Sequence, residues 1–203
     1  MPVQTAVRSF IYREFFMTYG AQEIHVLIIT LYGYIILEMA EYKHLKHGFG
    51  PLYDKDSRIL ILGSFPSVAS RKQNFYYGHP QNRFWKVLAS LYSEEVPETV
   101  AEKKAFLLRN RITLYDVIEE CDIKGSSDSS IKNVVPTDLR IITEKARIEK
   151  IFCNGHMAGR LFERYQSKET NIEMRILPST SPANAACTLK KLTGEWAVIL
   201  NDE

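Results

Sequence analysis

The chain has 203 residues, of which 45% are apolar and 25% are charged, so it is long enough for one globular domain with a sizeable core. Its net charge of +2 excludes the strongly basic composition of many nucleic-acid-binding proteins, although a locally basic face would be compatible with it. The cysteines, Cys121, Cys153 and Cys187, are far apart and form no CxxC or Cys/His ligand pattern. We therefore expect free thiols in a reducing cytoplasm, with no metal and no cofactor.

The N-terminal stretch differs from the rest of the chain. Residues 24–39 are nearly all apolar, but this run is shorter than the roughly 18 to 20 residues that a membrane-spanning helix needs. It also lacks the basic start and cleavage site of a secretory signal. It fits an extra strand–turn element, an interfacial helix, or sequence upstream of the natural start. We expect residues 1–42 to be a peripheral or non-native extension of a domain at 43–203, with no stable membrane association.

Short apolar runs follow at intervals along the chain. Residues 58–63 are typical of a strand that is buried on both faces. Residues 148–153 predict a second buried strand, and residues 172–177 predict a third strand. Residues 112–117 fit a strand or an extended segment, and residues 125–130 form a polar loop. These runs predict at least three strands of one sheet.

Helical patterns connect these runs. Residues 82–92 have helical spacing and place Phe84 and Trp85 on an apolar face that we expect in the core. Thr99, followed three residues later by Glu102, predicts a capping box at the start of a second helix. Further helices are expected from the cap residue Thr137 to about residue 146, at 156–166, at 183–192 and at 195–200.

This alternation of strands and helices predicts an α/β protein, specifically a three-layer α/β/α fold with a central parallel sheet. In such sheets, ligands bind beyond the carboxyl ends of the strands. The loops at residues 63–67, 154–155 and 178–184 leave the predicted strands at that end. We therefore expect these three loops to converge on one site.

Three segments resemble a known family: LILGSFPS at residues 60–67, YYGHPQNRFW at 76–85 and LPSTSPAN at 177–184. Together they resemble the uracil-DNA glycosylase superfamily, and most of all its hypoxanthine-DNA (deoxyinosine) glycosylase branch. The mismatch-specific uracil/thymine glycosylases have a similar HPxNRFW element. The resemblance covers about residues 47–200. It implies a DNA-repair enzyme that flips a deaminated base out of DNA and hydrolyses its N-glycosidic bond.

Two positions depart from the better-known branches of this superfamily. Phe65 stands where those branches usually carry an Asp or Asn that handles the attacking water, and Leu177 stands where His or Asn often precedes Pro-Ser. The hypoxanthine branch implies Asn82 as the main catalytic side chain. An amide can hold a water and donate an N–H, but it is not basic, so we expect positioning and electrostatics to dominate. The structural alternative for Asn82 is a helix N-cap.

Other residues of the three segments are candidates for contacting the base or the DNA. Phe65, Tyr76 and Tyr77 could stack on a flipped base or fill the core. Small turn residues could donate backbone N–H groups to phosphates, or serve only their turns. His79 could contact DNA or support its own turn, and Asp116 is either a second polar group of the site or a loop or cap residue. The candidates for base or DNA binding are Gly63, Ser64, Phe65, Pro66, Ser67, Tyr76, Tyr77, His79, Ser179, Ser181 and Asn184.

Three functional hypotheses remain at this point. The first is a monofunctional hypoxanthine glycosylase, because the three segments contain no lysine for a Schiff-base step. The second is excision of uracil or mismatched thymine. The third is a non-catalytic module that binds damaged DNA. Phe65 favours this hypothesis, because it replaces the polar residue of the first motif. The expected partner is DNA containing a deaminated base, and the expected state is a cytoplasmic monomer.

Overall fold

The computed structural model describes residues 42–125 and 127–200, so the expectation for the N-terminal extension lies outside the described residues except at Tyr42. Among the residues in these two ranges, no helix combines the length and the apolar character that crossing a membrane requires.

A four-stranded parallel sheet, in the order β3-β2-β6-β7, forms the centre of the fold. Its strands are β2 (Ile59–Gly63), β3 (Ile112–Asp116), β6 (Lys150–Asn154) and β7 (Met174–Leu177). All four predicted strands are confirmed, including the segment that fitted either a strand or an extended chain. The register pairs Gly63 with Asp116 and Asn154 with Leu177. The carboxyl ends of these strands therefore lie at one edge of the sheet.

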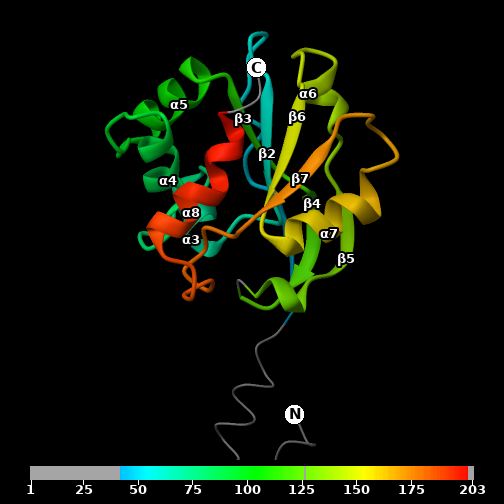
Figure 1. Ribbon diagram of the computed structural model, residues 1–203. Helices are drawn as coiled ribbons and strands as arrows, with labels where there is room; N and C mark the ends of the chain where they lie inside the picture. Colours follow the sequence, from blue (N-terminus) through cyan, green and yellow to red (C-terminus); the bar gives the residue numbers. More distant parts are fainter. Residues whose placement is uncertain (1–41, 126, 201–203) are drawn as a thin grey trace, which may run out of the picture. The chain divides into compact units, whose positions relative to one another are not determined.

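Helices cover both faces of this sheet, which confirms the α/β/α prediction (Figure 1). Figure 1 shows α4, α5 and α8 on one side of the sheet, and α6 and α7 on the other. The helices are α3 (Val68–Gln73), α4 (Phe84–Leu91), α5 (Val100–Arg109), α6 (Arg140–Thr143), α7 (His156–Tyr165) and α8 (Leu189–Trp196). Phe84 and Trp85 are buried in the core, as predicted.

One helix start was predicted correctly and another was not. In α5, the Thr99 hydroxyl accepts the Glu102 N–H at 3.2 Å and the Glu102 carboxylate accepts the Thr99 N–H at 3.0 Å, so the capping box is confirmed. The prediction that Thr137 caps a helix reaching residue 146 is wrong, because α6 is a single short turn. The buried Thr137 hydroxyl instead donates to the Asp116 carbonyl at 2.8 Å. That bond fixes the backbone at the end of β3.

The C-terminal helical prediction is also too long at its start. α8 begins at Leu189, where the side chain of the N-cap residue Thr188 accepts the Lys191 N–H at 3.2 Å. A short 3-10 helix, η2 (Ala197–Ile199), follows it. The residues just before Thr188 form turns, because Pro182 and the turn-forming residues near it favour a loop.

A second sheet was not predicted. It is antiparallel and consists of β1 (Lys43–Lys46), β4 (Ile118–Ile123) and β5 (Lys132–Pro136) in the order β1-β4-β5. Its outer side chains form cross-strand ion pairs, such as His44 with Asp122 and Lys46 with Glu120. The predicted polar loop contains the short 3-10 helix η1 (Asp128–Ser130). This sheet brings His47, which follows β1, beside the end of β3.

Candidate functional site

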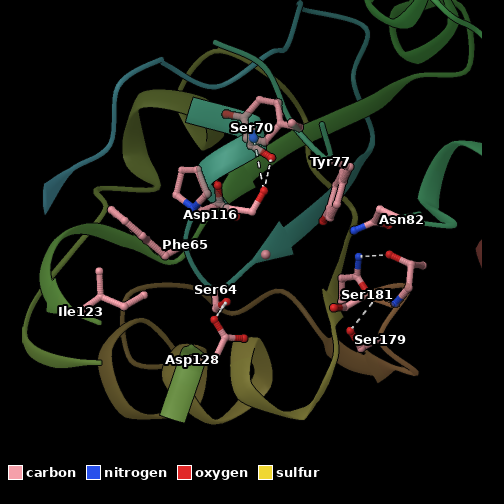
Figure 2. Close-up of a pocket in the computed structure, with 16 residues that line it drawn as sticks. Ser64, Phe65, Ser70, Tyr77, Asn82, Asp116, Ile123, Asp128, Ser179 and Ser181 are labelled. Carbon is pink, nitrogen blue, oxygen red and sulfur yellow. Dashed lines mark hydrogen bonds between the residues drawn. The ribbon is translucent and has the colours of Figure 1, made fainter. Parts of the chain in front are cut away.

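A cavity of about 140 Å³ lies beyond the carboxyl ends of β2, β3 and β6 (Figure 2). All three loops that were predicted to converge contribute to it, through residues 63–67, Asn154 and residues 179–181. The remaining lining residues are Ser70, Tyr76, Tyr77, Asn82, Asp116, Ile123 and Asp128. Figure 2 shows Phe65 and Ile123 at one side of the pocket and Tyr77 and Asn82 at the other.

The structure places ten of the predicted site residues at this pocket and two outside it. The two are His79 and Asn184. The exposed His79 ring accepts the Gln81 N–H at 3.2 Å, so it shapes its own turn. The Asn184 side chain donates to the Ser179 carbonyl at 2.9 Å, and this hydrogen bond stabilises the loop that lines the pocket.

Asn82 lies at the pocket wall, two residues before the first residue of α4. The N-cap residue of α4 is Arg83, so the alternative that Asn82 is the N-cap is wrong. The Asn82 Oδ1 nevertheless accepts the Phe84 N–H at 3.0 Å and so stabilises the turn that enters the helix. Among the described residues, none accepts a hydrogen bond from its Nδ2. This turn uses only the side-chain oxygen, so the amide hydrogens remain available for a ligand.

Arg83 joins the HPQN segment to the last pocket loop. Its guanidinium donates to the carbonyls of Ser181 at 2.6 Å and Asn184 at 3.0 Å, and also to that of Cys187. Its Nε and its backbone N–H both donate to the Thr180 carbonyl. The Arg in the motif therefore holds two sides of the pocket together, a role that only the folded geometry reveals.

The aromatic candidates differ in their positions. Phe65 is 8% exposed and faces the pocket, with the Arg71 guanidinium 5.7 Å from its ring centroid. Tyr76 is almost fully buried and its hydroxyl donates to the Gly50 carbonyl at 2.9 Å, so most of its ring serves the core. Tyr77 stacks on Phe84 with centroids 3.8 Å apart.

Tyr77 is held in an unusual backbone conformation, with φ = 51°. Its hydroxyl is buried and has no hydrogen-bond partner among the residues that the structure describes. Burial, reinforced by the negative charge of Asp116, raises the pKa of Tyr77 far above its usual range. The hydroxyl therefore remains a neutral O–H donor at the pocket.

Asp116 is the last residue of β3 and lines the pocket, which corrects the alternative that it is a loop or cap residue. Its Oδ2 lies 2.9 Å from Nε2 of His47, and both side chains are buried. The sequence offered a signal for Asp116, since it is a carboxylate ending an apolar strand. It offered none for His47, which lies in a polar segment far from the motifs.

Asp128 is a second carboxylate at the pocket that the sequence analysis missed. The Ser64 hydroxyl donates to its Oδ1 at 3.1 Å. Although the residue as a whole is exposed, enclosure of its carboxyl raises its pKa, the Ser64 hydrogen bond opposes that shift, and the charge of Asp116 adds to it. Asp128 was hidden in a serine-rich loop that has no strand or helix pattern.

The serines of the pocket loops also stabilise their own turns. Ser67 caps α3 by accepting the Ser70 N–H at 3.2 Å. Ser179 accepts the Ser181 N–H at 3.2 Å, and Ser181 accepts the Ala183 N–H at 3.3 Å. Their turn roles are thus present, and they do not conflict with backbone contacts to a phosphate.

The pocket as a whole combines aromatic walls, amide and hydroxyl donors and two carboxylates. Its lining contains no lysine, and among the described residues no three His, Cys, Asp or Glu side chains are grouped as metal ligands would be. A pocket beyond the strand ends of an α/β/α fold lies where such sheets bind their ligands, and aromatic walls with a few polar groups are typical of ligand sites.

Comparison with known proteins identifies the family. The sequence model of the Uracil DNA glycosylase superfamily matches residues 51–202. A protein of Methanosarcina acetivorans named Hypoxanthine DNA glycosylase is 34% identical over 159 residues, which cover 76% of this chain and 98% of that protein. A protein of the same name from Methanosarcina barkeri is 33% identical over 156 residues, covering 75% and 96%.

A solved structure agrees with these relatives. The solution NMR structure of a candidate uracil DNA glycosylase from Methanosarcina acetivorans has a TM-score of 0.67 and 33% sequence identity, covering 77% of this chain and 96% of that one. The chain therefore belongs to the uracil DNA glycosylase superfamily.

Proposed function

We propose that this chain is a monofunctional DNA glycosylase that flips deoxyinosine out of DNA and releases hypoxanthine. The single observation that carries the proposal is the placement of Asn82 at the wall of the pocket, opposite an apolar Phe65. Two relatives that match about three quarters of the chain are named Hypoxanthine DNA glycosylase. Phe65 stands where the first motif of the better-known branches carries a polar residue, and this difference sets the chain apart from an ordinary uracil enzyme.

The reaction breaks the bond between C1′ and N9, and the electron pair leaves with the base. Positive charge develops on the sugar, a water oxygen forms the new bond at C1′ and releases a proton to solvent, and the departing base takes up a proton from solvent. Asn82 positions this water or donates to the departing base through Nδ2. Because an amide is not basic, Asn82 contributes orientation and electrostatics.

The other pocket residues bind the substrate. Phe65 and the accessible edges of Tyr76 and Tyr77 contact the flipped base, whose stacking offsets the few kcal/mol that unstacking costs. The backbone of residues 63–67 and 179–181 approaches the phosphates flanking the lesion. The absence of lysine from the pocket lining supports simple hydrolysis without a Schiff base.

We place this activity in residues 43–203, because every pocket residue lies there. We further propose that the protein acts as a monomer in the cytoplasm, where its three free and buried cysteines would stay reduced. Sedimentation of the purified full chain would test the monomer, and the intact mass of the native protein would show whether residues 1–42 are present in the cell.

The proposal is tested with duplexes that contain inosine, uracil or a G·T mismatch, each incubated with excess full-length protein. We expect release of hypoxanthine to be fastest, and Asn82→Ala to lower its single-turnover rate by more than tenfold without weakening DNA binding comparably, because the water or leaving base loses its partner. Asn171→Ala, which alters an exposed Asn outside the pocket, is the matched control and should retain the wild-type rate.

A non-catalytic damage-binding module is the second candidate, and Phe65 is the observation that favours it. Tight binding of inosine DNA by the wild type, with no base released at stoichiometric protein, would establish that alternative. Faster release of uracil or thymine than of hypoxanthine would instead reassign the substrate within the same superfamily.

A further inference from the structure

Two polar atoms share the space above Gly63, the last residue of β2. A Cβ built on Gly63 would lie 2.2 Å from Oδ1 of Asp116 and 3.6 Å from the hydroxyl oxygen of Tyr77. Only a residue without a side chain leaves this space open. An acceptor and a donor thus face the same small volume at the end of β2.

The acceptor is rigidly held. The Asp116 backbone is paired with β2, its carbonyl accepts the Thr137 hydroxyl, and its Oδ2 is bonded to His47. The His47 ring is itself enclosed by Phe49, at 4.6 Å between centroids, and by Tyr115, at 5.3 Å. Because His47 occupies Oδ2, the side chain presents Oδ1 to the pocket as a hydrogen-bond acceptor.

The donor is held equally well. The Tyr77 ring lies flat on Phe84, and its left-handed backbone conformation fixes where the ring points. Asn154 lies beside the hydroxyl, but its Oδ1 already accepts the Thr180 N–H at 2.9 Å and its Nδ2, which donates to the Thr180 hydroxyl at 2.9 Å, can only donate, so Asn154 offers the Tyr77 O–H no free acceptor. A buried hydroxyl without a partner is costly unless a ligand completes its hydrogen bond.

We propose that Asp116 and Tyr77 together read the lactam edge of the flipped base, its adjacent ring N–H and C=O, with His47 as the positioning residue for Asp116. This inference rests on the proposed glycosylase function and names the chemical class of its substrate. Asp116 Oδ1 accepts the hydrogen bond from the ring N–H. The Tyr77 hydroxyl donates to the neighbouring carbonyl oxygen.

The chemistry of deamination explains why such a pair would be selective. Adenine presents a bare N1 acceptor beside an amino donor, whereas hypoxanthine presents an N1–H donor beside the O6 acceptor. In adenine both groups are reversed, so N1 would face a carboxylate and the amino group would face an O–H donor. A site that pairs buried polar groups with its substrate rejects an analogue that leaves them unpaired by about 10⁴-fold or more.

The test measures single-turnover base release by the full chain from duplexes containing hypoxanthine, 1-methylhypoxanthine or adenine. The methylated base keeps the carbonyl and loses the N–H. The wild type should release hypoxanthine at least about a hundredfold faster than 1-methylhypoxanthine, and should leave adenine in place.

The variants should separate the two hydrogen bonds. Asp116→Asn, which removes the charge of the acceptor, should slow the release of hypoxanthine about tenfold or more and leave the release rate of 1-methylhypoxanthine unchanged. Tyr77→Phe should slow the release of both bases to the same extent, because both carry the carbonyl. His47→Phe should reproduce the selective loss of Asp116→Asn, and His47→Gln, which keeps a donor for Oδ2, should recover part of it.

Several outcomes would overturn the inference. Equal release of hypoxanthine and 1-methylhypoxanthine by the wild type would do so without any variant, even if Asp116→Asn failed to fold. Equal slowing of both bases in a folded Asp116→Asn or His47→Phe variant would show that these side chains only support the structure. Wild-type protein that releases neither base would instead refute the proposed function itself.

Discussion

Arg83 shows how a single side chain can determine the shape of this pocket. Its guanidinium reaches carbonyls over a span of the chain from Thr180 to Cys187, and it sits next to Asn82. A lysine has one nitrogen where arginine has a planar fork of five donors, so it cannot satisfy these carbonyls together. The motif therefore requires Arg for geometry as well as for charge.

We predict that Arg83→Lys lowers the free energy of unfolding by about 1–3 kcal/mol, because partly buried carbonyls lose charge-assisted hydrogen bonds. Urea denaturation measures this effect. Arg140→Lys is the matched control, because Arg140 is exposed and its guanidinium pairs with the neighbouring Asp138, and its unfolding midpoint should stay at the wild-type value. An Arg83→Lys variant as stable as the wild type would contradict the proposal that Arg83 holds the two pocket segments together.

At the same scale, the sequence predicted part of the site and not the rest. Asn82 and Phe65 were identifiable because they lie in contiguous motifs next to strand and helix signals. His47 and Asp128 were not, because each reaches the pocket from a polar segment whose position depends on the second sheet. Pairing across distant strands leaves no local pattern in a single sequence.

At the scale of elements, the junction between β6 and α7 governs one pocket wall. Gly155 has φ = 99°, a conformation that residues with a side chain rarely adopt, and a Cβ there would lie 2.9 Å from the Ser179 Cβ. This glycine lets the loop carrying Ser179 approach the end of β6. The two pocket segments are consequently coupled through one backbone position.

Gly155→Ala is therefore predicted to destabilise the fold by about 1–3 kcal/mol, through backbone strain and a steric contact. Gly194→Ala is the control, because Gly194 lies in α8 with nothing within 4 Å of a built Cβ. The control should be more stable than wild type by up to about 1 kcal/mol, the difference in helix propensity. Thermal unfolding of both variants measures the two changes in melting temperature. Equal shifts for Gly155→Ala and Gly194→Ala would contradict the strain proposed at Gly155.

The two sheets also differ in how far the sequence could predict them. Residues such as Leu60 and Phe152 lie in continuous apolar strands, which are recognisable because both faces are buried. β1 and β5 are mostly exposed and rich in polar or charged residues, so they lack the alternating pattern of a half-buried strand. The helices predicted to start at Thr137 and at residue 183 begin later in the structure, at Arg140 and Leu189. The residues before these helices favour turns more strongly than their helical spacing favours a helix.

At the scale of the whole molecule, family membership and the pocket support each other. The matched region, residues 51–202, contains every lining residue of the pocket. The relatives match at about one third identity over almost their whole length. The fold could be predicted from strand–helix alternation, whereas the bracing by Arg83 and the pair formed by His47 and Asp116 required the structure.

The most direct test of the central claim is to identify the base released from an inosine-containing duplex by the wild-type chain in excess. We predict free hypoxanthine in an amount equal to the abasic sites formed, with the strand cut only after alkali is added, because hydrolysis without a Schiff base leaves the backbone intact. Bound but unaltered inosine DNA, with no free hypoxanthine, would contradict the account.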